Sequence, residues 1–292
     1  MVNFEHKDRL FTFMFGREEN REWMLSLYNA VNGSGYTDAE AIEITTIDDA
    51  VYMGMKNDAL FLLHWVMSLW AHQSTYNLNM PVRELMYLGK LYDKYIHQRK
   101  ANIYGSTLIR LPVPKLVVFY NGRKDQDDEK ILRLSDAFPD NVDVVPDVEV
   151  NVRMLNINRD HNQKLMRACK PLSEYAWLVQ AIRDNTVDGD VESAVDKAID
   201  EMPEDYLIRD FLVGNRAEVK DMCLTEYDEE ETMQMFMEEG ERKGRAEGRA
   251  EGEDKLARLM QALLSAGRTD DAQKATVDLA TRTSLYEEFS IA

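Results

Sequence analysis

The sequence predicts an α/β (α+β) protein, with a mixed α/β N-terminal half followed by an all-α C-terminal region. Short apolar runs rich in β-branched and aromatic residues lie before residue 160, and Pro, Gly and Asn bound them. After His161, apolar residues recur at helical spacing. Apolar residues make up 45% of the chain, which is enough to build a core.

The first elements are expected to be one or two helices within residues 5–35, ending at the glycine-rich stretch 32–35. Residues 41–58 are rich in Ile, Thr, Val and Tyr and predict strands. The bulky apolar segment 58–75 fits two strands with a tight turn near His64. A single buried helix is the alternative, because periodicity alone does not separate the two in a short apolar run.

The middle of the chain predicts a helix over 82–99, with Leu85, Leu88 and Leu91 among its apolar residues. The nearly continuous apolar run 115–122 indicates a buried strand. Residues 123–141 are polar and are expected to form a loop with a short turn of helix. Residues 142–158 alternate in part and predict a further strand, with an edge or a bulge at a proline.

The C-terminal region predicts several amphipathic helices and an unusual tail. Glycines recur every fourth residue at Gly240, Gly244, Gly248 and Gly252. Because each glycine costs a helix about 1 kcal/mol relative to alanine, the stretch suggests a hinge or a conditionally helical linker. Two short helices follow, the first capped by Gly267.

Three regions are therefore expected. A core occupies residues 1–160, a helical region packed on it occupies 161–238, and a linker with a helical pair for oligomerisation or regulation occupies 239–292.

Composition excludes several classes of protein. No stretch approaches the roughly 20 apolar residues of a membrane span, and the first ten residues lack the apolar run of a secretory signal. Two cysteines without CxxC spacing exclude a disulfide framework and a thiolate zinc site, and they fit a reducing cytoplasm. We therefore expect a cytoplasmic protein that does not bind membranes.

The net charge of −18 is unevenly distributed. Residues 1–170 sum to −2 and residues 171–292 to −16, whereas residues 81–120 sum to +5. An acidic chain is a poor candidate for nucleic-acid binding, but a polyanion would meet the local basic segment. The alternative is a solvated helix face that happens to be basic.

Residue patterns alone indicate a site only weakly. Asp58 precedes a strand-like run, and Ala71 and Gln73 would point to one face of a strand that meets Asp58 in a hairpin. A hydrolytic Mg²⁺ site needs one or two carboxylates, and Asp58 has no evident partner. The sequence contains no HExxH, P-loop, GxGxxG or GxSxG motif.

Longer blocks of sequence carry more information. They are FTFMFG (11–16), LSLYNAVNGSGYT (25–37), MKND (55–58), AHQSTYNLNMPVREL (71–85), NIYGSTLIRLPVPKLVVFYNG (102–122) and LSDAF (134–138). In this order and spacing the chain resembles the Rpn family of recombination-promoting, transposase-like nucleases, within the PD-(D/E)XK nuclease superfamily. The resemblance covers about residues 5–215, and the Gly-Glu repeats of the tail also resemble the end of that family.

This resemblance implies a restriction-endonuclease-like mixed sheet core flanked by helices. It also implies a metal-dependent DNA endonuclease, with Mg²⁺ or Mn²⁺ as cofactor, DNA as substrate and a homodimer as the assembly, acting in recombination, mobile elements or phage defence. The motif Asp falls on Asp58, and the backbone carbonyl of His72 is a further expected metal ligand. Gln73 falls where the motif has Lys or Gln, and Ala71 falls where it has the second carboxylate, a Glu.

The alanine at position 71 departs from the motif. Alanine binds no metal ion and orients no water, so this chain is expected to be inactive or nearly so. It is either an active nuclease deliberately inactivated by substitution or a natural degenerate copy that acts as a non-catalytic scaffold for DNA or a partner. The intact blocks around Ala71 favour the first explanation.

Other parts of the expected site are less defined. The basic residues expected to flank a DNA backbone are Arg83, Lys90, Lys94, Lys100 and Arg110. The superfamily's N-terminal helix contributes an acidic residue, for which Asp8, Glu19 and Glu22 are equally suitable candidates.

The acidic C-terminal half is expected to shield the basic segment or to serve assembly. Residues 228–231 are all Asp or Glu, whose codons begin with GA, and they lie just before Met233. A purine-rich message at this place can serve as a ribosome-binding site. We therefore expect a short C-terminal product starting near Met233, which pairs with the full chain.

Overall fold

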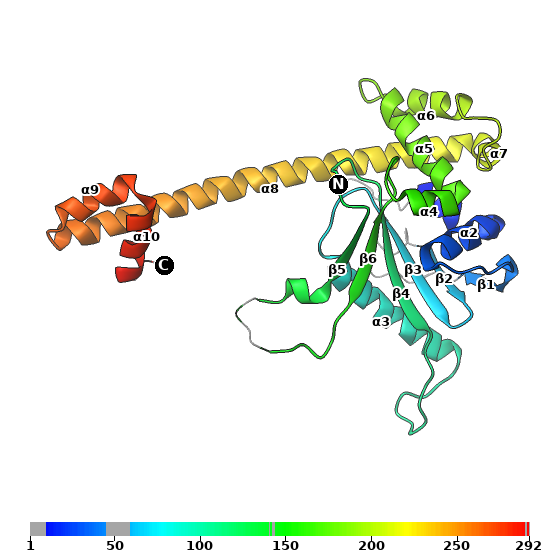
Figure 1. Ribbon diagram of the computed structural model, residues 1–292, viewed down its shortest axis with the longest axis horizontal. Coiled ribbons are helices and arrows are strands. Elements are labelled where there is room, and N and C mark those ends of the chain that lie inside the picture. The colour runs from blue at the N-terminus through cyan, green and yellow to red at the C-terminus, as the bar shows by residue number, and fades with distance from the viewer. Residues whose placement is uncertain (1–9, 45–58, 140, 142–143, 290, 292) are drawn as a thin grey trace. The chain divides into compact units, whose positions relative to one another are not determined.

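The structure is a computed structural model that describes residues 10–44, 59–139, 141, 144–289 and 291 (Figure 1). The chain divides into two compact units, Met1–Glu230 and Glu231–Ala292. In the first unit, the helices that follow residue 160 share one apolar cluster with the sheet. The second unit has a small core of its own.

The first unit is built on a six-stranded mixed sheet with strand order β1-β2-β3-β4-β6-β5. The strands are β1 Ile42–Ile44, β2 Ala59–Leu63, β3 Val66–Gln73, β4 Val113–Tyr120, β5 Glu129–Arg133 and β6 Asn151–Asn156. Strand β4 is parallel to both β3 and β6, and the other neighbouring pairs are antiparallel. The predicted α+β class is confirmed.

Within the segment 58–75, residues 59–73 form a strand hairpin, which excludes the alternative of a buried helix. Ala59 pairs with Trp70 and Leu63 with Val66, so the turn contains two residues, His64 and Trp65. His64 has a φ of 54°, in the left-handed region that such tight turns require. Asp58 lies outside the described residues, directly before β2 in the sequence.

Helices cover both faces of the sheet (Figure 1). One face packs with α1 Leu10–Phe15, α2 Arg21–Asn32, α4 Gln163–Ala168, α5 Lys170–Asn185, α6 Val191–Asp200 and α7 Arg209–Gly214. The other face packs with α3 Met80–Gln98. Because side chains alternate along a strand, Trp70 belongs to the first cluster and its neighbours Leu69 and Ala71 to the second.

Two expectations for the middle of the chain hold only in part. The short turn of helix expected within residues 123–141 is present at Leu134–Ala137, but strand β5 lies where a loop was expected; of its five residues only Leu132 is buried, so the apolar signal is weak. The strand expected over 142–158 is confined to β6, because Val144, Val145 and Val148 are exposed in an irregular segment.

The second unit contains the later part of α8 Arg216–Ser265, together with α9 Thr269–Val277 and α10 Leu279–Glu288. The glycine repeat continues α8 without a break, so the stretch is helical here. Gly267, with a φ of 72°, follows the end of α8 as predicted. The core of this unit is formed by Leu259, Leu263, Ala272, Ala275 and Leu285. Among the described helices none combines the length and the apolar character needed to cross a bilayer.

Candidate functional site

The expected motif residues occupy the second half of β3. Ala71 is 1% exposed and faces the α3 side of the sheet. Gln73, two residues on, shares that face and ends the strand, where it is partly exposed. Its backbone oxygen accepts a hydrogen bond from the Asn121 amide, 3.1 Å away. Ala71 and Gln73 thus lie on one face, while Asp58 is outside the described residues.

The side chain of His72 points to the opposite face and is buried. Its ring stacks on Phe11 with 5.2 Å between the ring centroids, and its Nε2 lies 3.2 Å from the hydroxyl of Tyr175. The imidazole is therefore part of the packed core. Only the backbone carbonyl of His72 remains as the expected metal ligand.

The two acidic candidates from the N-terminal region that the structure describes, Glu19 and Glu22, do not lie beside Ala71. Asp8 lies outside the described residues. Glu19 is exposed and pairs with Arg17 at 3.4 Å, and Glu22 is exposed in the first turn of α2. Helix α2 buries its apolar side in the cluster on the other face of the sheet.

The five basic residues fall into two groups. Arg83, Lys90 and Lys94 are spaced seven and four residues apart, so they share one flank of α3. The guanidinium of Arg83 lies 3.3 Å from the hydroxyl of Tyr87. Lys94 also lines a cavity of about 240 Å³ formed by α3 with β2 and β3.

Lys100 and Arg110 lie at the other end of β3. Lys100 follows the end of α3, where Arg99 stacks over the ring of Trp65 at 5.8 Å. Arg110 precedes β4, whose first residue pairs with Val66. Gln73 is seven residues after Val66, a distance of about 23 Å along a strand. These two residues are therefore remote from the end of β3 that carries Gln73.

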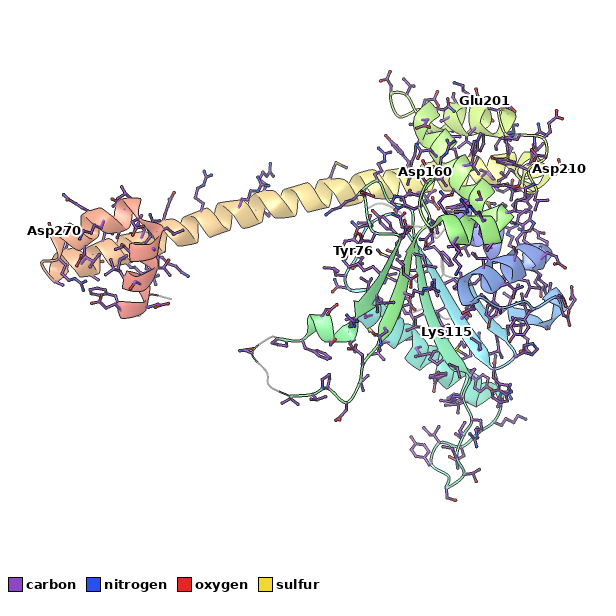
Figure 2. All side chains as sticks on the ribbon, in the orientation of Figure 1. Tyr76, Lys115, Asp160, Glu201, Asp210 and Asp270 are labelled. Atoms are coloured by element: carbon purple, nitrogen blue, oxygen red, sulfur yellow. The ribbon has the colours of Figure 1, made fainter. Side chains whose placement is uncertain are left out.

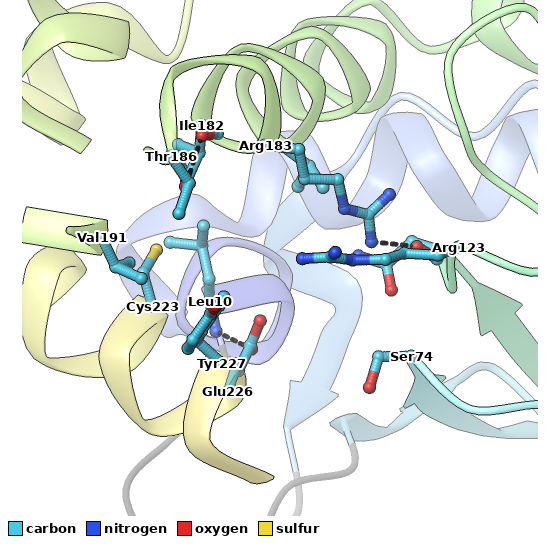
Figure 3. A pocket seen from close by; sticks show the side chains of 12 residues that line it. Leu10, Ser74, Arg123, Ile182, Arg183, Thr186, Val191, Cys223, Glu226 and Tyr227 are labelled. Atoms are coloured by element: carbon cyan, nitrogen blue, oxygen red, sulfur yellow. Dashed lines mark hydrogen bonds between the residues drawn. The ribbon is translucent and has the colours of Figure 1, made fainter. Parts of the chain in front are cut away.

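A polar cluster at the carboxyl ends of β3, β4 and β6 was not expected from the sequence. Ser74, Asn121, Arg123 and Arg183 line a cavity of about 70 Å³ (Figure 3). One Arg183 nitrogen donates to the Asn158 side chain at 2.9 Å, and another donates to the carbonyl of Asn121. Ligands of open α/β sheets commonly bind at the carboxyl ends of parallel strands.

The opposite wall of this cavity comes from the C-terminal helices. The carboxylate of Glu226 accepts a hydrogen bond from the Leu10 amide at 3.0 Å, which satisfies a free N–H at the start of α1 (Figure 3). Cys223 lies nearby, and burial raises the pKa of its thiol far above the usual value. This cysteine is therefore a packing residue and a poor nucleophile.

Polar side-chain contacts join the segments around β5 and β6. His161 lies 2.8 Å from Asp128, and this hydrogen bond lowers the pKa of the Asp128 carboxyl. Arg153 binds both carboxylate oxygens of Glu129, at 2.7 and 2.8 Å, and lowers the pKa of Glu129. The hydroxyl of Tyr76, a residue labelled in Figure 2, accepts from Lys130 at 2.6 Å and links the segment after β3 to β5.

The donor set around Ala71 fits a divalent cation only in part. The amide oxygen of Gln73 and the carbonyl of His72 are hard ligands, but position 71 supplies none. Within the described ranges, no three His, Cys, Asp or Glu side chains are close enough together to hold a metal ion.

The sequence offered one signal for the polar cluster, namely Asn121 and Arg123 just after β4 and Asn158 just after β6. Arg183 carries no such signal, because only the packing of α5 brings it there. Comparison of the chain with family models, with curated proteins and with solved structures gives no match.

Proposed function

We propose that the first unit is a DNA endonuclease of the metal-dependent, restriction-endonuclease-like type, and that alanine at position 71 suppresses its hydrolytic activity. One observation carries the proposal: the β2–β3 hairpin leads through α3 into the parallel strand β4, and it places Ala71 and Gln73 on one face. These two residues stand where the resemblance puts the Glu and the Lys or Gln of the motif.

The roles of the residues follow from their chemistry. When bound, Mg²⁺ or Mn²⁺ would supply Lewis acidity and a water of lowered pKa. The amide of Gln73, at the partly exposed end of β3, would position that water or a phosphate oxygen. Asp58 and the carbonyl of His72 would hold the cation, and the methyl group of Ala71 would add neither a ligand nor charge.

A second candidate function is a non-catalytic scaffold for DNA or a partner chain. The observation that favours it is the surroundings of Ala71, which is 1% exposed within an apolar cluster that includes Leu69 and Val118. An alanine is well accommodated in such a place, and a chain that has lost hydrolysis still keeps its folded surface.

Supercoiled plasmid distinguishes the two functions. With Mg²⁺ or Mn²⁺, the Ala71→Glu variant is expected to nick plasmid at least about 100-fold faster than the unaltered chain. A side chain that binds the metal ion directly contributes at least as much to metal affinity as a residue that only supports such a ligand. Ala71→Gln is the matched control, with the same size and no charge. A folded Ala71→Glu variant that cuts no faster than this control would contradict the proposed function.

The two groups of basic residues give a separate prediction for DNA binding. The double reversal Lys90→Glu/Lys94→Glu is expected to weaken duplex binding. It is also expected to reduce the slope of the logarithm of affinity against the logarithm of salt concentration by about one for each phosphate that is no longer bound. The matched control is Lys100→Glu/Arg110→Glu, which makes the same change in charge in the segment between the end of α3 and β4, off the flank of the helix. Equal losses of affinity in the two variants, measured by fluorescence anisotropy at several salt concentrations, would show that the α3 flank is not the binding site.

The expected short C-terminal product gains support from the division of the chain. The second unit begins at Glu231, two residues before Met233, and contains its own apolar core. A product starting at Met233 would therefore hold nearly the whole of this unit. We propose that it pairs with the full chain and that the full chain forms a homodimer.

A further inference from the structure

We propose that the cavity at the carboxyl ends of β3, β4 and β6 binds a phosphate monoester that still carries one proton. The proposal goes beyond the proposed function, because it requires neither cleavage nor a metal ion. The cavity lining includes two cationic donors, Arg123 and Arg183, and two acceptors, Asn121 and Glu226. Its volume of about 70 Å³ is several times the 10–15 Å³ or so that one water molecule needs, so it can hold one phosphate group.

Two arginines from different elements bring positive charge to the cavity. Arg183 of α5 is fixed by hydrogen bonds that it donates to the Asn158 side chain at 2.9 Å and to the carbonyl of Asn121. Arg123 follows β4, and its exposed side chain reaches toward the same space (Figure 3). Because the guanidinium fork matches the geometry of phosphate oxygens, this pair of arginines is suited to an oxyanion.

The side chain of Asn121 indicates that the ligand carries a hydrogen of its own. Asn121 is 4% exposed, and its Nδ2 donates to the hydroxyl of Tyr175 at 3.4 Å. Its Oδ1 is buried and has no hydrogen-bond partner among the residues that the structure describes. Because a buried acceptor without a partner destabilises the fold, a ligand in the cavity that donates a hydrogen bond to this oxygen would gain affinity.

Glu226 sets the same requirement from the other wall. Its carboxylate accepts a hydrogen bond from the Leu10 amide at 3.0 Å, which holds the glutamate at the cavity (Figure 3). A fully ionised oxyanion is repelled by this negative charge, whereas a P–OH group can be directed toward it. The two guanidinium groups outweigh the single carboxylate, so the pocket attracts an anion but favours one that is partly protonated.

This combination of donors and acceptors selects among oxyanions. The second pKa of a phosphate monoester is about 6, so near neutral pH a part of the population keeps one hydrogen on oxygen. Sulfate and the phosphodiester groups within a DNA strand carry no such hydrogen at neutral pH. The pocket therefore fits free phosphate, or the terminal phosphate of a nucleotide or a nucleic-acid strand, and it does not fit the internal backbone of DNA.

Calorimetry with inorganic phosphate and with sulfate tests the proposal on the full chain at constant ionic strength. Phosphate is expected to bind at least about 100-fold more tightly than sulfate, because a site that accepts a hydrogen from its ligand rejects an analogue without one. Arg123→Gln is expected to weaken phosphate binding at least about tenfold, since it removes a charged hydrogen bond. Arg167→Gln is the matched control, because Arg167 of α4 is also exposed and lies outside the lining.

A second variant tests the acceptors. In Glu226→Gln the amide oxygen can still accept from Leu10, but the negative charge is gone. Sulfate is therefore expected to bind more tightly, and the preference for phosphate over sulfate to fall at least about tenfold. Melting temperatures without anion show that each variant is folded, and phosphate is expected to raise the melting temperature of the unaltered chain more than that of Arg123→Gln.

Oligodeoxynucleotides of one sequence with a 5′-phosphate, a 3′-phosphate or only hydroxyl ends identify the source of the phosphate. If the pocket takes the end of a strand, one phosphorylated form binds more tightly than the hydroxyl form, and Arg123→Gln removes the difference. If it takes free phosphate, the three bind alike while inorganic phosphate still binds.

Three results would overturn the proposal. They are equal affinities for phosphate and sulfate, an unchanged phosphate affinity in folded Arg123→Gln, and no binding of phosphate or of any phosphorylated strand to the unaltered chain. None of them affects the proposed function, because plasmid cleavage by the Ala71→Glu variant is measured separately.

Discussion

Replacing Gly122 with alanine is expected to destabilise the first unit by about 3 kcal/mol or more, at the upper end of the cost of overpacking a core. A Cβ atom at this position would lie 2.0 Å from the backbone oxygen of Ser74 and 2.5 Å from the hydroxyl of Tyr120. Neither distance is tolerable, and the closer atom belongs to the backbone, so the clash cannot be relieved by a rotamer change. The segments after β3 and β4 must move apart.

The displacement would affect the candidate site directly. The Asn121 amide donates to the oxygen of Gln73, and the carbonyl of Gly122 accepts from the Asn158 side chain at 3.0 Å. Both hydrogen bonds join the carboxyl ends of neighbouring strands. A shift at Gly122 strains both, and we expect the position of Gln73 to change as well.

Urea unfolding followed by circular dichroism measures the effect. Gly89→Ala is the control, because no atom lies within 4 Å of a Cβ at this exposed position of α3. Alanine in a helix interior is favoured over glycine, so this variant is expected to gain about 0.5–1 kcal/mol. Equal urea midpoints for Gly122→Ala and the unaltered chain would show that Gly122 does not lie as close to the backbone of Ser74 as the structure places it.

The elements that the sequence predicted are those with a dense local pattern. The β2–β3 hairpin and β4 are nearly continuous apolar runs bounded by turn residues, and such runs indicate buried strands. Strand β5 could not be predicted, because it is an edge strand with Leu132 as its only buried residue, so it carries no alternation of apolar and polar residues. The register of β5 against β6 is a long-range property that a local pattern does not encode.

The candidate site was also predictable in part, where it depends on a local sequence pattern. The strand period of two is enough to predict that Ala71 and Gln73 share one face. The apolar residues expected to define α3 included Leu85 and Leu88, but these are only partly buried. The buried stripe runs through Met80, Glu84, Tyr87, Leu91 and Tyr95.

A sequence pattern fixes the rotation of a helix about its axis only to within a fraction of a turn. For this reason Glu84, which lies in the buried stripe, looks like an ordinary surface residue in the sequence. The carboxyl-end cluster was missed for a different reason. Arg183 and Asn121 are 62 residues apart in the sequence, and only the packing of α5 against the end of β4 brings them together.

Replacing Trp70 with alanine is expected to cost about 3–5 kcal/mol, the usual range for removing a large buried aromatic side chain. Trp70 is 1% exposed and packs edge-on against Phe61 of β2, with ring centroids 4.5 Å apart, and against Phe119 of β4, at 5.5 Å. One side chain thus connects three adjacent strands. Because a domain is stable by only about 5–15 kcal/mol, a loss of this size brings the first unit close to unfolding.

Trp65 provides a matched control in the same hairpin. It is 55% exposed in the turn and stacks with Arg99, so Trp65→Ala is expected to lose only the 0.5–1 kcal/mol or so of an exposed cation–π contact. Equal destabilisation of Trp70→Ala and Trp65→Ala in urea would show that the packing of Trp70 against Phe61 and Phe119 does not stabilise the hairpin. Trp70 pairs with Ala59 and directly precedes Ala71, so loosening it separates the strand that carries Ala71 and Gln73 from its neighbours. A Trp70→Ala chain that stays folded at low temperature is therefore expected to bind Mn²⁺ more weakly, although Trp70 offers the ion no ligand.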